Sequence, residues 1–96
     1  MNKRMLITKF PNHVTIRLIY QATNEFKKPL ILNKFVTQQT QLISNRFEPT
    51  VGIRLTEKGF YNEEVYMEFV LNDITVDQVK NTLQDLFPVM SCSMGK

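Results

Sequence analysis

Residues 65–87, VYMEFVLNDITVDQVKNTLQDLF, decide the fold because a strand and a capped helix follow each other within them. In residues 65–71 the apolar side chains alternate with Tyr66 and Glu68, and this period of two predicts a strand with one buried side. Tyr66 is then placed on the side that faces away from the core.

The helix that follows has clear signals at both ends. Thr75 and Gln78 have the spacing of a capping box, in which each side chain satisfies a backbone N–H at the helix start. Apolar residues recur at helical spacing after the cap, with polar residues on the opposite side. Pro88 predicts that the helix ends at about Phe87.

Two further strands are expected around this unit. Residues 50–56 alternate in the same way as residues 65–71, so the two segments predict a hairpin, with a long tip at residues 57–64 that exposes Phe60 and Tyr61. Residues 89–94 alternate again and predict a short terminal strand, with Cys92 on its apolar side.

The first half of the chain is more ambiguous. Residues 14–21 fit a strand by alternation, although some apolar residues from 14 to 26 also lie four apart as in a helix; the β-branched residues favour the strand. Pro29 suits the first turn of a helix, which we expect over about 29–38. A strand is expected over residues 40–47, and residues 4–10 could add a strand at an edge of the sheet.

This order of elements predicts one domain, residues 1–96, of the α+β class. The expected architecture is ferredoxin-like, β-α-β-β-α-β, with an antiparallel sheet, two helices on one of its faces and an additional N-terminal edge strand. The second face of such a sheet meets solvent, a ligand or a partner.

Composition is that of an ordinary globular protein, with 43% hydrophobic and 22% charged residues. No apolar run is long enough to span a bilayer, and Lys9 ends a short apolar stretch near the N-terminus, so neither membrane insertion nor export is expected. A single cysteine fits a reducing compartment. We therefore expect a cytoplasmic location.

Charge is distributed unevenly along the chain. Residues 1–56 contain nine Lys or Arg against two acids, whereas residues 57–96 contain three Lys against seven acids. The basic part could meet an anionic partner, or two differently charged surfaces could cover one core or meet across a dimer. The sequence leaves these alternatives open.

Patterns typical of catalytic and metal sites are not found in the sequence. His13 lies in an expected turn without a carboxylate or cysteine at motif spacing, and nothing basic is adjacent to Cys92 to activate its thiol. There is no Cys-x-x-Cys pair, no histidine-rich segment and no glycine-rich phosphate loop. We expect a non-enzymatic protein with no cofactor and no metal.

One binding hypothesis concerns nucleic acid. RNA-recognition domains share the β-α-β-β-α-β order and read bases with aromatic side chains on the free face of the sheet. Lys58-Gly59-Phe60 is similar to the start of their third-strand motif, but Glu63 and Glu64 follow where phosphates would be repelled, and only Tyr66 is well placed. Nucleic acid is thus the third choice.

A second hypothesis comes from a family resemblance. Arg17-Leu18-Ile19-Tyr20, Pro29-Leu30-Ile31 and Gln41-Leu42-Ile43 resemble, in this order, the motifs of the NIL domain, the ACT-like module of methionine importer ATPases. The family's Asn-Ile-Leu begins here with Gln41, the segment 49–64 is longer than in the family, and residues 1–13 are additional. The resemblance implies a ferredoxin-like regulatory domain that dimerises through its sheets and binds an amino acid near the interface.

Taken together, a non-enzymatic ligand-binding or regulatory module is the first expectation, as a homodimer through a sheet edge or face. The candidate ligand-binding residues lie in the expected strand 40–47: Leu42, Ile43, Ser44, Asn45 and Arg46. One of Leu42 and Ile43 should face the core. The alternative is a small protein-interaction or inhibitor protein, for example phage-encoded, that binds a host factor through Phe60, Tyr61 and Tyr66.

Overall fold

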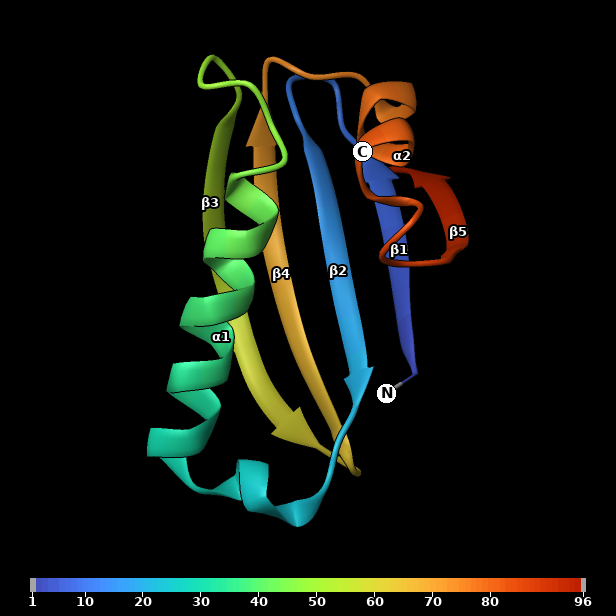
Figure 1. Ribbon diagram of the computed structural model, residues 1–96. Coiled ribbons are helices and arrows are strands. Elements are labelled where there is room, and N and C mark those ends of the chain that lie inside the picture. The colour runs from blue at the N-terminus through green and yellow to red at the C-terminus, as the bar shows by residue number, and fades with distance from the viewer. Residues whose placement is uncertain (1, 96) are drawn as a thin grey trace.

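The computed structural model describes residues 2–95, which form a five-stranded sheet, two α-helices and a short 3-10 helix (Figure 1). In chain order the elements are β1 Lys3–Lys9, β2 Val14–Gln21, η1 Asn24–Lys27, α1 Pro29–Ser44, β3 Gly52–Tyr61, β4 Glu64–Asn72, α2 Val76–Leu83 and β5 Val89–Met94. The expected α+β class is confirmed: from β2 to β5 the strands and α-helices follow the ferredoxin-like order, and β1 is an additional strand.

The sheet has the strand order β3-β4-β2-β1-β5. The expected position of the additional strand was wrong, because β1 lies inside the sheet, between β2 and β5, and not at an edge. A tight turn in which the Phe10 N–H donates to the His13 carbonyl (2.8 Å) folds β1 back onto β2 as an antiparallel hairpin. β5 then adds to the free side of β1 in parallel, so the sheet is mixed rather than purely antiparallel.

The parallel pairing of β5 follows from the helix that precedes it. A parallel connection needs a crossover segment, usually a helix, and α2 carries the chain from β4 across the sheet to β5. The capping box is present: the Gln78 N–H donates to Thr75 Oγ1 (3.1 Å), and the Thr75 N–H donates to the Gln78 side chain (2.9 Å). The helix ends at Leu83, one turn before the expected end, and residues 84–87 form a turn.

Both helices cover the same face of the sheet (Figure 1). Their inward side chains join those of the strands in one hydrophobic cluster, which is how the core of a two-layer domain forms. The fully or nearly fully buried members are Met5, Ile7, Val14, Ile16, Leu18, Tyr20, Val36, Ile43, Val65, Met67, Phe69, Leu71, Val79, Leu83 and Phe87.

The expected strand over residues 40–47 was wrong. Helix α1 continues to Ser44, well beyond the expected end at residue 38, and Asn45 closes it by donating its N–H to the Gln41 carbonyl (3.0 Å). Val36 and Ile43 are seven residues apart, two helical turns, and both are buried against the sheet. Burial of this helical stripe outweighs the weak local preference of residues 40–47 for a strand.

The hairpin of β3 and β4 is tighter than expected. The strands extend to Tyr61 and from Glu64, so only Asn62 and Glu63 form the turn, with φ of 53° and 60°. Two consecutive residues with positive φ give the turn whose twist matches the strands that it joins. The long exposed tip predicted for residues 57–64 is therefore mostly strand.

Candidate functional site on the open face of the sheet

The helices leave one face of the sheet uncovered. The side chains on this open face alternate along each strand with those of the core, and the register of the strands brings them together. They include Arg4, Leu6 and Thr8 from β1, Thr15, Arg17 and Ile19 from β2, Glu64, Tyr66, Glu68 and Val70 from β4, and Arg54, Glu57, Gly59 and Tyr61 from β3.

Tyr66 lies on β4 near the β3–β4 turn and is held from two directions. Its cross-strand neighbour on β3 is Gly59, and the phenol ring lies so close to this glycine that a Cβ atom there would overlap with the ring. The guanidinium carbon of Arg17 lies 4.7 Å from the centre of the same ring, within the range of a cation–π interaction. Tyr66 is therefore fixed in place before any partner binds.

Arg17 is in turn held by two carboxylates. Its Nη1 atom lies 3.3 Å from Glu57 and 3.7 Å from Glu68, while Glu68 also accepts from the Thr56 hydroxyl (3.3 Å). Each of these surface ion pairs contributes little to stability by itself. Together they orient the guanidinium over Tyr66.

Charges of the two signs balance on the open face. Arg4 forms an ion pair with Glu64 across the sheet at 2.7 Å, in addition to the pairs made by Arg17. With Arg54 the open face carries three arginines, and Glu57, Glu64 and Glu68 provide an equal number of carboxylates. The excess of basic residues in the first half of the chain thus does not produce a basic patch here.

A hollow of about 420 Å³ lies at the β3–β4 end of this face. Its lining contains the three residues predicted to contact a partner, Phe60, Tyr61 and Tyr66, which the structure therefore brings together; Arg17, Ile19 and Glu64 complete it. Tyr61 is 77% exposed, whereas Phe60 packs partly against the core and contributes to the margin of the hollow. We call this set the tyrosine hollow.

The residues predicted to bind a ligand are not brought to one site. Ile43 is fully buried in the core, and Leu42 is exposed on helix α1, so the expectation that one of the two faces the core holds. Arg46 bridges to Asp85 at 3.0 Å and donates to the Thr82 carbonyl at 3.3 Å, which ties the end of α1 to α2. Residues 41–43, which carry the third motif of the NIL resemblance, are helical rather than extended.

Ser44 and Asn45 lie together on one concave surface, whereas Arg46 lines a separate, smaller hollow of about 290 Å³ beside α2. They line a groove of about 450 Å³ between α1 and β3, together with Val36, Thr37, Thr40, Gln41, Leu55 and Lys58. Hydroxyls, amides and one ammonium group therefore face the same space. Such a lining can bind a small polar molecule by hydrogen bonds and one charge contact.

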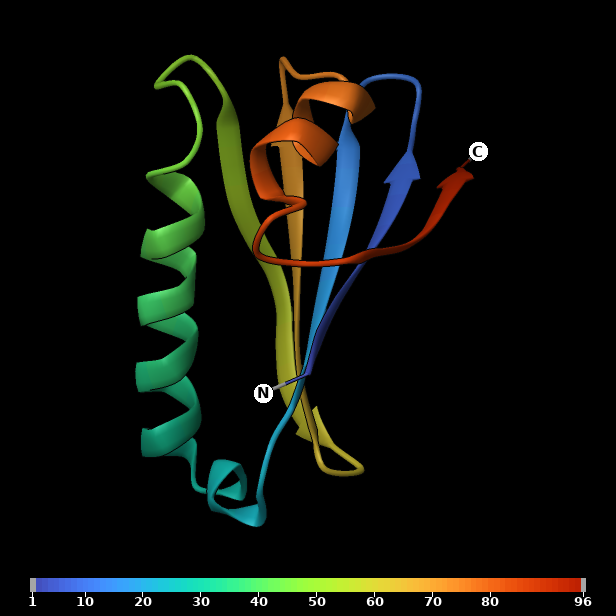
Figure 2. The same ribbon diagram turned by 45° about the vertical axis from the view of Figure 1, so that its right-hand side comes forward.

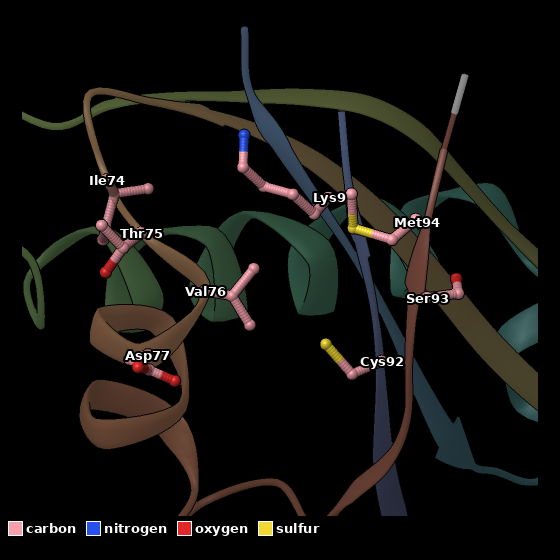
Figure 3. A pocket seen from close by; sticks show the side chains of 8 residues that line it. All are labelled: Lys9, Ile74, Thr75, Val76, Asp77, Cys92, Ser93 and Met94. Carbon is pink, nitrogen blue, oxygen red and sulfur yellow. The ribbon is translucent and has the colours of Figure 1, made fainter. Parts of the chain in front are cut away.

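A third hollow, of about 460 Å³, lies between the start of α2 and the end of β5 (Figure 3). Cys92 of β5 and Val76 of α2 point toward each other across it, and Met94 and Lys9 line its upper part. Cys92 is exposed, contrary to the expectation that it lies on a buried side. The reason is that α2 is only eight residues long and does not cover the edge strand.

His13, considered above for a chemical role, and the buried Tyr20 both contact neighbouring side chains. The His13 ring stacks on Phe10 with the ring centres 4.7 Å apart. Burial raises the pKa of the Tyr20 hydroxyl above its usual range, and this hydroxyl donates to the Gln39 side chain at 3.1 Å. Within residues 2–95 no three His, Cys, Asp or Glu side chains lie close enough together to hold a metal ion.

The sequence did not reveal Arg17 and Gly59 as parts of the site. Both are recognised only once the register is known, since it sets Arg17 opposite Glu68 and Gly59 opposite Tyr66. An isolated glycine in a strand is a signal of close approach by another group, and this signal was present at Gly59.

Comparison with family models, with curated proteins and with solved structures found no match to this chain. No helix in the described part of the chain is long and apolar enough to cross a membrane.

Proposed function

We propose that this chain is a non-enzymatic interaction module that binds another protein through the open face of its sheet. The observation that carries the proposal is the fixed position of Tyr66 between Gly59 and Arg17, beside the exposed Tyr61. Tyrosine and arginine are the residue types that most often dominate the energy of protein interfaces. Side chains that are already ordered also lose less conformational entropy on binding.

The charges on the open face favour a protein over a nucleic acid as the partner. The outward arginines of β1 and β2, Arg4 and Arg17, already lie beside glutamates, so phosphates that approach them would also meet carboxylates. A folded protein that presents charges of both signs around an apolar centre is complementary to such a face. Binding through Tyr61 and Tyr66 is thus the form of the interaction that we expect.

The test uses a photo-crosslinking amino acid at position 61 and, as a matched control, at the exposed position 38 on helix α1. A partner should be captured from position 61 and not from position 38. The purified partner should then bind the unmodified chain, and Tyr66→Ala should weaken this binding at least about tenfold, which corresponds to roughly 1.4 kcal/mol. Equal capture from both positions, or equal affinity of Tyr66→Ala, would contradict the proposal. Retardation of RNA at low salt that disappears with added salt would favour nucleic-acid binding instead.

A second candidate is the binding of a small polar ligand such as an amino acid, and it is favoured by the groove between α1 and β3. In that groove Lys58 could meet a carboxylate, while Thr40, Ser44 and Asn45 offer hydrogen bonds. A thermal-shift series across the amino acids tests it, because a ligand that binds only the folded state raises the melting temperature. The shift should be lost in Lys58→Ala and kept in Lys34→Ala; no shift at millimolar ligand would exclude this candidate.

A further inference from the structure

The two edges of the sheet differ in how well they are protected from other strands. β3 carries Arg54, Glu57 and Lys58, and its pairing with β4 is irregular between Leu55 and Glu57. Charges and bulges of this kind are the features by which natural proteins prevent pairing at an edge. β3 is therefore the protected edge.

β5 has none of these charges. Its sequence, Val89-Met90-Ser91-Cys92-Ser93-Met94, contains no charged residue and no proline. Its pairing with β1 shifts register once, between Val89 and Ser91, and is regular from Ser91 to Met94. Figure 2 shows β5 at the margin of the sheet with no other element beyond it. The backbone groups on the outer side of β5 thus have no neighbouring strand among residues 2–95.

Apolar side chains are also left uncovered at this edge. Met90 is 62% exposed and Met94 is 81% exposed, and Met94 and Cys92 line the hollow between α2 and β5 (Figure 3). An exposed and uncharged edge strand beside an apolar hollow is typical of a surface that is covered by another strand.

We propose that β5 pairs antiparallel with β5 of a second copy of this chain, with Cys92 opposite Cys92. In this register Ser91 lies opposite Ser93 and Met90 opposite Met94, so each residue meets its own kind across the seam. No like charges oppose each other across the seam, because β5 has no charged residue. A partner strand that carries charges would place them against the methionines of β5.

The pairing joins the two sheets edge to edge around a two-fold axis perpendicular to them. Helices of both copies then lie on one side of the joined sheet, and both open faces lie on the other. The tyrosine hollow stays accessible, so this pairing and the proposed function can fail independently of each other.

Sedimentation equilibrium of charge variants at position 92 tests the pairing and its register. Cys92 is exposed, so Cys92→Lys and Cys92→Glu should both leave the fold intact, as circular dichroism can verify. The unmodified chain and Cys92→Ser should be dimers. Each charged variant should dimerise roughly tenfold more weakly or worse, and an equimolar mixture of the Lys and Glu variants should form heterodimers. A monomeric unmodified chain at millimolar protein, or charged variants that dimerise like Cys92→Ser, would overturn the proposal.

Oxidative crosslinking gives a second measurement that does not depend on a charged variant. Opposite residues of an antiparallel pair have Cα atoms about 4.5–5.5 Å apart, which a disulfide can span. Diamide should therefore link the unmodified chains through Cys92. A matched variant that carries Cys92→Ser and Ser93→Cys should link much more slowly, because residue 93 lies opposite residue 91. Equal rates for the two would refute the register.

Discussion

Replacing Gly59 by alanine should have opposite effects on stability depending on whether Tyr66 is present. Gly59 has no positive φ, so its backbone accepts alanine without strain. The added Cβ atom, however, would overlap with the phenol ring, and both the hydroxyl and two ring carbons are affected. The ring cannot bend, so Tyr66 must turn away from Gly59 and from Arg17.

The expected magnitude follows from two opposing effects. Glycine in a strand costs roughly 0.5–1 kcal/mol relative to alanine, so the substitution alone should stabilise the fold by about that amount. Forcing an aromatic side chain out of its place costs about 1–3 kcal/mol, and the cation–π contact with Arg17 adds about 0.5–1 kcal/mol when it is lost. Gly59→Ala should therefore destabilise the natural chain by about 1–3 kcal/mol, and in a Tyr66→Ala background it should be neutral or stabilising.

The assay is a double-mutant cycle of urea unfolding over the natural chain, the two single variants and the double variant. An interaction free energy of about 1.5 kcal/mol or more between positions 59 and 66 is expected. Additive effects would refute the placement of the Tyr66 ring over Gly59. The same variant separates the function from the fold, since Gly59→Ala keeps every side chain of the tyrosine hollow and changes only where Tyr66 lies.

Three further predictions concern the fold. Ile43→Ala should cost about 2–5 kcal/mol of unfolding free energy and the neighbouring Leu42→Ala less than about 1 kcal/mol, because Ile43 is fully buried and Leu42 is 42% exposed; similar urea midpoints for both would contradict the burial of Ile43 in the core. Thr75→Ala should cost about 1 kcal/mol by removing half of the capping box, whereas Thr75→Ser should cost much less, and thermal unfolding separates the two. Burial raises the pKa of Tyr20, so the folded state holds this proton more tightly than the unfolded state. The free energy of unfolding that this difference contributes is complete below a pH of about 10, the usual tyrosine pKa, and falls as the pH rises further. In unfolding measured from pH 8 to 11, Tyr20→Phe should therefore lose less unfolding free energy than the natural chain.

The elements that the sequence predicted well are those with strong local signals. The strand at 65–71 and the capped start of α2 depend on alternation and on a side-chain motif, and both are present in β4 and α2. Residues 40–47 lack such a signal, because Leu42 and Ile43 are adjacent and fit either a strand or a helix. The helix is favoured over the strand because it places Ile43 in the core, two turns after Val36.

The candidate site was predictable only in part, for a related reason. Tyr66 was recognised because the alternation of residues 65–71 places it on the non-core face, and Phe60 and Tyr61 because they were expected at an exposed hairpin tip. Arg17 and Gly59 become neighbours of Tyr66 through pairings between strands that lie far apart along the chain. Local patterns carry no information on these pairings until the order of the strands is known.

The insertion of β1 into the sheet makes the last strand of the chain dependent on the first. Thr8 and Ser93 lie side by side in β1 and β5 although 85 residues separate them, whereas β1 and β2 are joined by a short turn. Contacts between distant segments form slowly, because a long loop must close before any pairing compensates for the lost entropy. During synthesis β1 can form its hairpin with β2 early. The other edge of β1 stays unpaired until β5 has been made. We therefore expect docking of β5 to be a late step of folding, and a nascent chain without β5 to expose β1 to other strands in the cell.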